Sequence, residues 1–562
     1  MKLDISVKRA GILAPVFAIR HCEDLGIGDT EGVRQMIDWC AANHLSVLQF
    51  LPINETGDDN SPYNAISSMA ICPTTLFIKP GVIPGLTVQI FDQLVPQDLL
   101  KEIQSGSVQY RKVKQLKRNL LQESFNNFLG DPDFEQFKET NKDWVVAYSF
   151  FRLLMEENTS QVVWDLWPDE QKTYSGAMVW VSNHSSRSQF LKKIEFFQFV
   201  QWLCFKQWSD LKSYAECKQV LLMGDVPFGI SRYSADTWSN SDLFDATWSG
   251  GCPPEPFFKP DDFTAKWGQN WGIPLYRWEE HRKENFKWWR RRVKGLHMYS
   301  HLFRIDHVLG FYRIYGFPWP PQRNHEFVNL TEKEAELLAG NLPHFFQGSD
   351  DDPIWAKKNK AQGEEILKVL QEAAGNTLLV AEDLGCVPNY VRPSLTELGI
   401  PGFKIPMFER TEPERFYKSS EDYQPLSVAT HATHDHLPMA AMWDVWNKEA
   451  KEAPNQSGGK YEMHCFLKWI GYKNTETPET WTDELHVAAT KALCKSGSFI
   501  IIFQLQDWFA TRQRFNVPGS ASDSNWSERL PINVSELYTS ESYQIKSNDM
   551  VAVLKETGRC AI

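Results

Sequence analysis

The chain of 562 residues is 42% hydrophobic and carries a formal net charge of −12, which suits one large globular domain with insertions or two to three smaller ones. The negative net charge gives no sign of a broad basic face, so we expect neither nucleic acid nor a membrane as a partner. The ten cysteines form no C-x-x-C pair, and charged residues interrupt the apolar stretch near the N-terminus. We therefore expect reduced cysteines, no signal peptide and a cytoplasmic location.

Aromatic residues make up 13% of the chain, and 22 of them are tryptophans. A tryptophan-rich core would explain this content, and so would a surface on which sugar rings stack. Composition alone favours the core.

Eight short apolar runs recur along the chain, and each ends in polar or acidic residues. Runs of this length without strict alternation are typical of parallel strands that are covered on both faces. Helical patterns lie between several of them, so they predict an α/β fold, a (β/α)8 TIM barrel with helical subdomain insertions. An open doubly wound sheet is the alternative. In chain order the runs cover residues 11–16, 45–53, 220–227, 301–307, 377–385, 402–408, 426–435 and 498–507.

The uneven spacing of these runs predicts insertions. Residues 1–84 hold the first part of the barrel, with a helix that begins near Asp29. Residues 85–215 have apolar side chains at three- and four-residue steps, which indicates a mainly helical inserted subdomain on the barrel rim. The remainder of the barrel lies in residues 216–562, with a rim loop at 250–280 and an insertion at 320–375.

Acidic residues follow three of the predicted strands. Asp306 ends the fourth strand, Glu382 lies near the end of the fifth, and Asp435 follows the seventh. One such residue alone is often a helix cap or a surface ion pair, but barrel strand ends converge on one mouth, so three together indicate a site.

Two of these carboxyl groups have surroundings that predict different pKa values. Arg304 shares a strand face with Asp306 and would hold that carboxylate ionised, whereas the apolar run before Glu382 would raise the pKa of its carboxyl group. Paired carboxyl groups with separated pKa values are what cleavage of a glycosidic bond requires.

Many segments of the chain resemble the 4-α-glucanotransferases called amylomaltases or disproportionating enzymes, glycoside hydrolase family 77. The segment WWRRRVKGLHMYSHLFRIDHVLGFYRIYGFP looks closest to the branch of cytosolic plant-type and bacterial enzymes. The resemblance implies a malto-oligosaccharide or α-glucan substrate, a retaining transfer reaction and no cofactor or metal. The matching segments, from residue 11 to about 530, include GIGDTEG, SPYNAISSMA, GDVPFGI, GQNWGIPLYRW, FRIDHVLGF, AEDLG, PGFKIPMF, THD and RFNVPG followed by NW.

The resemblance also implies roles for ten residues. Asp306 would be the nucleophile, Glu382 the general acid/base, and Asp435 the carboxylate that binds sugar hydroxyls at the transition state. The others match positions that contact substrate or lie near it: Arg304, Asp225, His434, Trp271, Tyr63, Asn525 and Gln506.

Two segments depart from the family pattern. The family often has T-H-D-N-D-T after the seventh strand, where this chain has THDHLP, so no role is carried over to positions after Asp435. The family loop P-P-D-Y-F is PPEPFF here, at residues 253–258. Because that loop lies over the donor groove, the resemblance does not predict the preferred acceptor or chain length.

The segment HATHDH raises the possibility of a metal-dependent barrel hydrolase. The commonest enzymes of that kind carry H-x-H on the first strand, and residues 11–17 have none. On a regular strand His434 and His436 would face away from Asp435, so one metal would not readily take all three. We therefore expect no catalytic metal.

Three further alternatives bear on function. LGIGDTEG at residues 25–32 lacks the G-x-G-x-x-G spacing of a dinucleotide-binding loop and predicts a turn into a helix capped by Asp29 or Thr30. A protein that only binds carbohydrate would not need the three carboxylates together. An α-glucan hydrolase of the same fold would need them, and it is the main alternative to a transferase.

Overall fold

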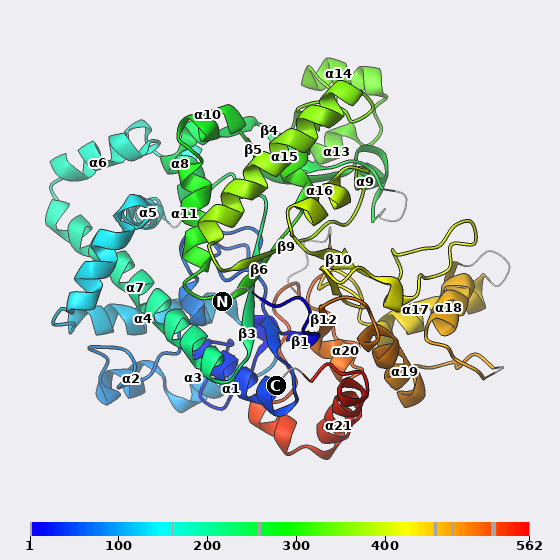
Figure 1. Ribbon diagram of the computed structural model, residues 1–562. Coiled ribbons are helices and arrows are strands. Elements are labelled where there is room, and N and C mark those ends of the chain that lie inside the picture. The colour runs from blue at the N-terminus through cyan, green and yellow to red at the C-terminus, as the bar shows by residue number, and fades with distance from the viewer. Residues whose placement is uncertain are drawn as a thin grey trace.

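Eight parallel strands close into a barrel at the centre of the molecule, in the order β1-β12-β11-β10-β9-β6-β3-β2 (Figure 1). The computed structural model describes residues 3–159, 161–255, 260–453, 458–474, 476–518 and 524–560. The strands are β1 (Arg9–Leu13), β2 (Val47–Gln49), β3 (Leu221–Val226), β6 (Leu302–Ile305), β9 (Leu378–Ala381), β10 (Gly402–Lys404), β11 (Ser427–Ala429) and β12 (Ile500–Gln504).

Each apolar run found in the sequence contributes one strand of this barrel. β1 pairs with both β2 and β12 in parallel register, which closes the sheet. The predicted (β/α)8 barrel is therefore confirmed, and the open sheet is not what forms.

The barrel interior is filled by side chains from all eight strands, among them Leu13, Met223, Leu302 and Val380. Neighbouring positions point the other way, and Phe303 on β6 packs into the larger core outside the barrel. Since side chains alternate along a strand, Arg304 and then Asp306 follow Leu302 on the inner side, toward the carboxyl end of the barrel.

Helices surround the barrel and make up most of residues 88–217 (Figure 1). The side chain of Asp29 caps α1, as expected, by accepting hydrogen bonds from the backbone N–H groups of Glu31 and Gly32. The division of the chain at residues 84 and 215 remains a prediction. The longer helices are α1 (Thr30–Ala42), α2 (Val88–Leu94), α3 (Gln97–Gln104), α4 (Tyr110–Asn126), α5 (Pro132–Glu157), α6 (Tyr174–Asn183), α7 (Arg187–Cys217), α11 (Lys287–Leu296), α14 (Glu332–Ala339), α15 (Pro353–Ala374), α16 (Val391–Glu397), α17 (Met439–Glu452), α18 (Gly458–Trp469), α19 (Asp483–Cys494) and α21 (Glu541–Glu556).

Shorter helices connect these elements. They are α8 (Ala235–Ser239), α9 (Asp262–Trp267), α10 (Trp278–Lys283), α12 (Leu309–Tyr312), α13 (Asn324–Phe327) and α20 (Leu505–Trp508).

A second, antiparallel sheet of four strands lies beside the barrel, in the order β5-β4-β7-β8. The sequence pattern does not predict this sheet, because β4 and β5 contain glycines and β5 a proline, residues that favour loops over strands. The sheet joins part of the rim loop at 250–280 to part of the insertion at 320–375. Its strands are β4 (Phe244–Cys252), β5 (Gln269–Tyr276), β7 (Ile314–Phe317) and β8 (His344–Phe346).

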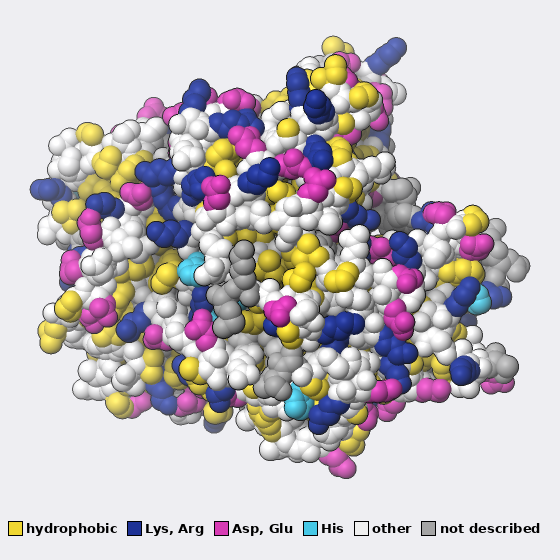
Figure 2. Space-filling model, viewed as in Figure 1, with side chains coloured by type: hydrophobic (Ala, Val, Ile, Leu, Met, Phe, Trp, Pro, Cys, Tyr) yellow, Lys and Arg dark blue, Asp and Glu magenta, His cyan; other side chains and the backbone are white. Residues whose placement is uncertain are grey.

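The surface carries both signs of charge. On the face drawn in Figure 2, Lys and Arg side chains are interspersed with Asp and Glu side chains. In the part of the chain that the structure describes, no helix is both long enough and apolar enough to cross a membrane.

Candidate active site

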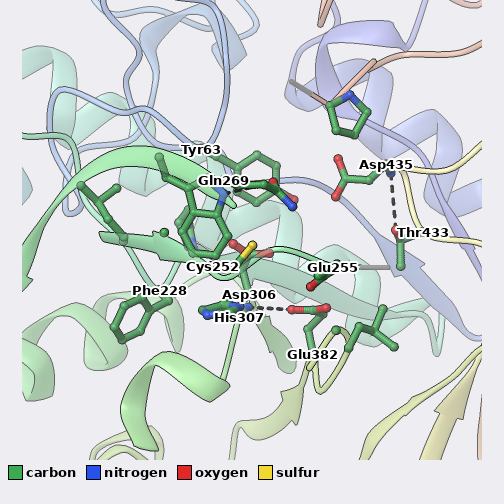
Figure 3. A pocket seen from close by; sticks show the side chains of 18 of the residues that line it. Tyr63, Phe228, Cys252, Glu255, Gln269, Asp306, His307, Glu382, Thr433 and Asp435 are labelled. Atoms are coloured by element: carbon green, nitrogen blue, oxygen red, sulfur yellow. Dashed lines mark hydrogen bonds between the residues drawn. The ribbon is translucent and has the colours of Figure 1, made fainter. Parts of the chain in front are cut away.

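A large cavity of about 1980 Å³ contains the strand-end carboxylates of the barrel (Figure 3). Two of the ten predicted site residues do not line it. Asp225 lies directly behind the wall, in contact with Arg304 and Tyr63, and Gln506 is buried in α20. The eight that line it are Tyr63, Trp271, Arg304, Asp306, Glu382, His434, Asp435 and Asn525.

Asp306 and Glu382 are neighbours because β6 and β9 pair in parallel, with Ile305 opposite Ala381. The residue that follows each strand is one of the two carboxylates, Asp306 after Ile305 and Glu382 after Ala381. His307 adopts a left-handed backbone conformation, with φ of 45°, and its N–H donates a hydrogen bond of 2.8 Å to Glu382 Oε2 (Figure 3). One oxygen of Glu382 is thus fixed by the backbone of the neighbouring strand end.

Arg304 links two carboxylates at the floor of the cavity. Its Nη1 donates to both carboxyl oxygens of Asp225, at 2.9 and 2.8 Å, and its Nη2 donates to Asp306 Oδ1 at 2.8 Å. The Tyr63 hydroxyl donates to Asp225 Oδ2 at 2.7 Å. Because the guanidinium is planar and 3% exposed, these bonds set the orientation of Asp306.

The pKa values of the two neighbouring carboxyl groups differ. Burial raises the pKa of Asp306 to about 6, although Arg304 acts to lower it. The pKa rises in spite of Arg304 because the loss of solvation and the nearby Asp225 and Asp435 carboxylates outweigh one guanidinium. Burial, together with Asp306, raises the pKa of Glu382 to about 8. Near pH 7 Asp306 is thus mostly ionised and Glu382 mostly protonated.

Asp435 approaches the cavity from the loop between β11 and α17. Its Oδ1 accepts a hydrogen bond of 2.7 Å from Asn516 Nδ2, and its Oδ2 lies 3.3 Å from His434 Nε2. Burial by itself would raise the pKa of Asp435, but its interactions with His434 and Arg304 and the hydrogen bond from Asn516 hold it below its usual range. Asp435 therefore stays ionised beside the other two carboxyl groups.

Two residues that hold Asp435 were missed by the sequence analysis. Asn516 contacts the carboxylate, and Arg514 Nη2 donates to the Asp435 carbonyl oxygen at 2.7 Å. Both belong to the segment RFNVPG, whose resemblance to the family was noted without a role for either residue. The RFNVPG motif is therefore the sequence feature that indicates Arg514 and Asn516.

Aromatic rings form part of the cavity wall. Tyr63 and His434 stack with ring centroids 5.2 Å apart and an angle of 8° between the rings. Trp271 is 37% exposed and lies edge-on to His307 at 4.7 Å. Asn525 also lines the wall, and its Oδ1 accepts a 3.0 Å hydrogen bond from Val517 N. Flat, apolar faces of this kind suit sugar rings.

Glu255 is a further acidic residue in the cavity that the sequence analysis did not single out. Figure 3 shows it among the side chains that line the cavity, and burial raises its pKa. It belongs to the loop at 253–258, of which residues 256–258 lie outside the described residues.

The histidines of HATHDH have separate surroundings. His431 packs against Trp469 and Phe503, His434 stacks on Tyr63, and His436 is 2.8 Å from the Thr433 hydroxyl. Within the described ranges, no group of three or more His, Cys, Asp or Glu side chains is arranged to hold a metal ion.

Comparison with known families assigns the chain to one of them. A model of glycoside hydrolase family 77, described as 4-alpha-glucanotransferase, matches residues 14–534. The chain belongs to this family. A 4-alpha-glucanotransferase of Chlamydia pneumoniae is 30% identical over 94% of this chain and 92% of its own length. The rice 4-alpha-glucanotransferase DPE2 is 32% identical over 96% of this chain and 69% of its own length.

Solved structures of the family share the fold of this 4-α-glucanotransferase. The amylomaltase from Streptococcus agalactiae, solved in complex with acarbose, superposes with a TM-score of 0.73 at 20% identity, over 98% of this chain and 99% of that one. The amylomaltase from Corynebacterium glutamicum superposes with a TM-score of 0.77 at 18% identity, over 97% and 75% of the two chains.

Proposed function

We propose that this 4-α-glucanotransferase moves α-1,4-linked glucan segments between malto-oligosaccharides by a retaining double displacement. Asp306 is the nucleophile and Glu382 the general acid/base. The observation that carries the proposal is the adjacent pair of carboxyl groups, one mostly ionised and one mostly protonated near neutral pH.

In the first half of the reaction, Glu382 gives its proton to the glycosidic oxygen as the bond to the anomeric carbon breaks. The Asp306 carboxylate attacks that carbon from the opposite face and forms a covalent β-glucosyl ester. The released glucan leaves with the proton, and Glu382 becomes a carboxylate. The bond from Arg304 orients Asp306 for this attack.

In the second half, the Glu382 carboxylate removes the proton from the 4-hydroxyl of an incoming glucan. That oxygen attacks the anomeric carbon, the ester bond to Asp306 breaks, and an α-1,4 bond forms again. We assign to Asp435 the binding of sugar hydroxyls, which strengthens as the ring distorts toward the transition state. His434 and Asn516, which hold Asp435, would keep it in place.

The size of the cavity supports an oligosaccharide substrate. Sites for drug-sized ligands measure roughly 300–1,000 Å³, and this cavity measures about 1980 Å³. The acarbose complex of the Streptococcus agalactiae amylomaltase also supports the assignment. We further propose a cytoplasmic location, because the ten cysteines are all unpaired.

Transfer rather than hydrolysis requires that a sugar hydroxyl meets the ester before water does. The rings of Tyr63 and Trp271 would hold an acceptor sugar against the site and give its hydroxyl a high effective concentration. An α-glucan hydrolase of the same fold would use the same carboxylates, so the residues alone do not separate the two reactions.

Incubation with maltotriose tests the proposal, with glucose and total reducing ends followed together. We expect glucose and longer glucans to form while the number of reducing ends stays constant. A rise in reducing ends that keeps pace with the loss of maltotriose would mean that water is the main acceptor, and would contradict the proposed transfer.

A further inference from the structure

Two residues of the cavity wall have no part in the mechanism above. Arg232 and Tyr233 line the same cavity as Asp306 and Glu382. They lie on the loop that leads from β3 to α8. Tyr233 is half-buried, so part of its ring remains available to a ligand.

Tyr233 contacts the short helical turn at Trp164–Leu166. Its hydroxyl lies 3.2 Å from Asp165 Oδ2 and donates a hydrogen bond to it. Trp164 packs against its ring, with centroids 6.4 Å apart and planes at 74°. The ring is therefore held by the Trp164 side chain and through its hydroxyl, which favours a stacking surface that is fixed in advance.

The backbone beside Tyr233 is fixed as well. Ser234 caps α8 in a capping box with Thr237, and the Thr237 hydroxyl donates to the Arg232 carbonyl oxygen at 2.7 Å. Such a double cap keeps the start of the helix in one conformation. The Tyr233 ring is thus preorganised for ligand binding.

This loop is also tied to the segment that carries Tyr63. Ala235 N donates to the Ile66 carbonyl oxygen at 2.8 Å, and Asp236 accepts hydrogen bonds from the backbone N–H and hydroxyl of Ser68 at 2.7 and 2.8 Å. These hydrogen bonds therefore fix the position of Tyr233 relative to the ring of Tyr63.

Arg232 supplies polar groups next to the ring. Its guanidinium carbon lies 5.6 Å from the centroid of the Tyr233 ring, and its Nη1 donates to the Ala246 carbonyl oxygen at 2.8 Å. A guanidinium has five N–H donors in a planar array. A flat ring beside such donors matches the chemistry of a glucose unit, which has an apolar face and a rim of hydroxyl groups.

We propose that Tyr233 and Arg232 form an outer glucose-binding subsite, which holds a sugar unit of the substrate away from the bond that is cleaved. This rests on the proposed function in that the ligand is an α-1,4-glucan. The Tyr233 ring stacks on the glucose face, and the guanidinium donates to its hydroxyls. The subsite makes the enzyme favour glucans longer than maltotriose.

Steady-state kinetics with maltotriose and maltoheptaose test the subsite. Tyr233→Ala should raise the ratio of KM for maltoheptaose to KM for maltotriose about two- to twelvefold, the range that an aromatic contact contributes. Tyr233→Phe keeps the ring and should restore most of the wild-type ratio. Tyr538→Ala removes a tyrosine that is 41% exposed and lies outside the cavity, and serves as the matched control. An unchanged ratio for Tyr233→Ala with a wild-type melting curve would overturn the proposal.

A binding measurement separates this inference from the catalytic assignments. Calorimetric titration of maltoheptaose into Glu382→Gln and into the Glu382→Gln/Tyr233→Ala double variant should show a Kd about two- to twelvefold weaker in the latter. Equal Kd values would count against the subsite. If Glu382→Gln itself turns substrate over, the proposed role of Glu382 fails, and the KM ratio in the wild-type background still decides the role of Tyr233.

Discussion

Arg304 touches two carboxylates, yet only one of them is proposed to react. Asp225 accepts two hydrogen bonds from the guanidinium and one from Tyr63, so its oxygens are engaged. Asp306 receives a single bond from Arg304, on Oδ1, and its side chain is 29% exposed toward the cavity. The same cation therefore immobilises one carboxylate and orients the other, which is the proposed nucleophile.

Substitution of the two proposed catalytic carboxyl groups should abolish most turnover without unfolding the protein. Asp306→Asn removes the nucleophile and Glu382→Gln removes the proton donor, so we expect kcat to fall by at least about 10²–10⁴-fold in each variant. Glucose release from maltotriose and a thermal melting curve measure the two effects. Near-normal kcat in either variant, with unchanged melting, would refute the corresponding role.

The rate should depend on pH as a bell-shaped curve. The reactive form has Asp306 ionised and Glu382 protonated, so kcat/KM should rise as the pH passes about 6 and fall as it passes about 8. The two limbs belong to the interacting pair rather than to isolated groups.

Arg304→Met tests the electrostatic part of this account. Loss of the guanidinium should raise the pKa of Asp306 further, since Arg304 acts to lower it, and the acidic limb should move to higher pH. An acidic limb at the wild-type position in an active Arg304→Met variant would contradict this electrostatic effect. Asp225→Asn provides a comparison, because it also perturbs Arg304 but leaves the cation in place.

At the scale of the elements, α15 must pass close to α12. A Cβ atom built on Gly363 of α15 would lie 2.1 Å from the Tyr312 ring, and Tyr312 is fully buried. The glycine therefore allows this approach of the two helices beside the strand end that carries Asp306.

Gly363→Ala should destabilise the protein by about 1–3 kcal/mol, because the added methyl group overpacks a buried contact. Gly295→Ala, at a helical glycine on α11 with open space around its Cβ position, is the matched control and should stabilise by about 0.5–1 kcal/mol. Urea unfolding followed by tryptophan fluorescence measures both. Equal midpoints for the two variants would show that the approach of α15 does not depend on Gly363.

At the scale of the whole molecule, the two ends of the chain meet at the amino end of the barrel strands. Arg559 is fully buried and donates hydrogen bonds to the carbonyl oxygens of Ser496 and Ser498, before β12, at 2.6 and 3.0 Å. It also donates to the carbonyl oxygen of Arg9, at the start of β1, at 3.2 Å. This one side chain joins the last helix to the first and last strands.

Arg559→Met should therefore lower the free energy of unfolding by at least about 2 kcal/mol, since it leaves buried carbonyl oxygens without donors. The active site lies at the opposite end of the barrel, so kcat below the melting temperature should stay near the wild-type value. Lys555→Met, at an exposed position on α21, should change neither quantity. A fall in kcat without a fall in stability would contradict the view that Arg559 supports folding at the amino end of the barrel and has no part in catalysis at the carboxyl end.

The barrel and the location of its carboxylates follow from local features of the sequence. Apolar runs and the residues that end them depend on local alternation and burial, so the strands and the placement of Asp306 and Glu382 could be predicted without knowledge of distant contacts. The order of motifs in the chain was also sufficient to indicate the family.

The support of the site depends on contacts that form only in the folded protein. The contacts of Asn516 with Asp435, and of Tyr63 with Asp225 and His434, join segments far apart in the chain, and no local pattern encodes them. The raised pKa of Asp306 has a related cause. A sequence reveals the guanidinium two residues away, whereas the loss of solvation that outweighs it depends on every element packed around the carboxylate.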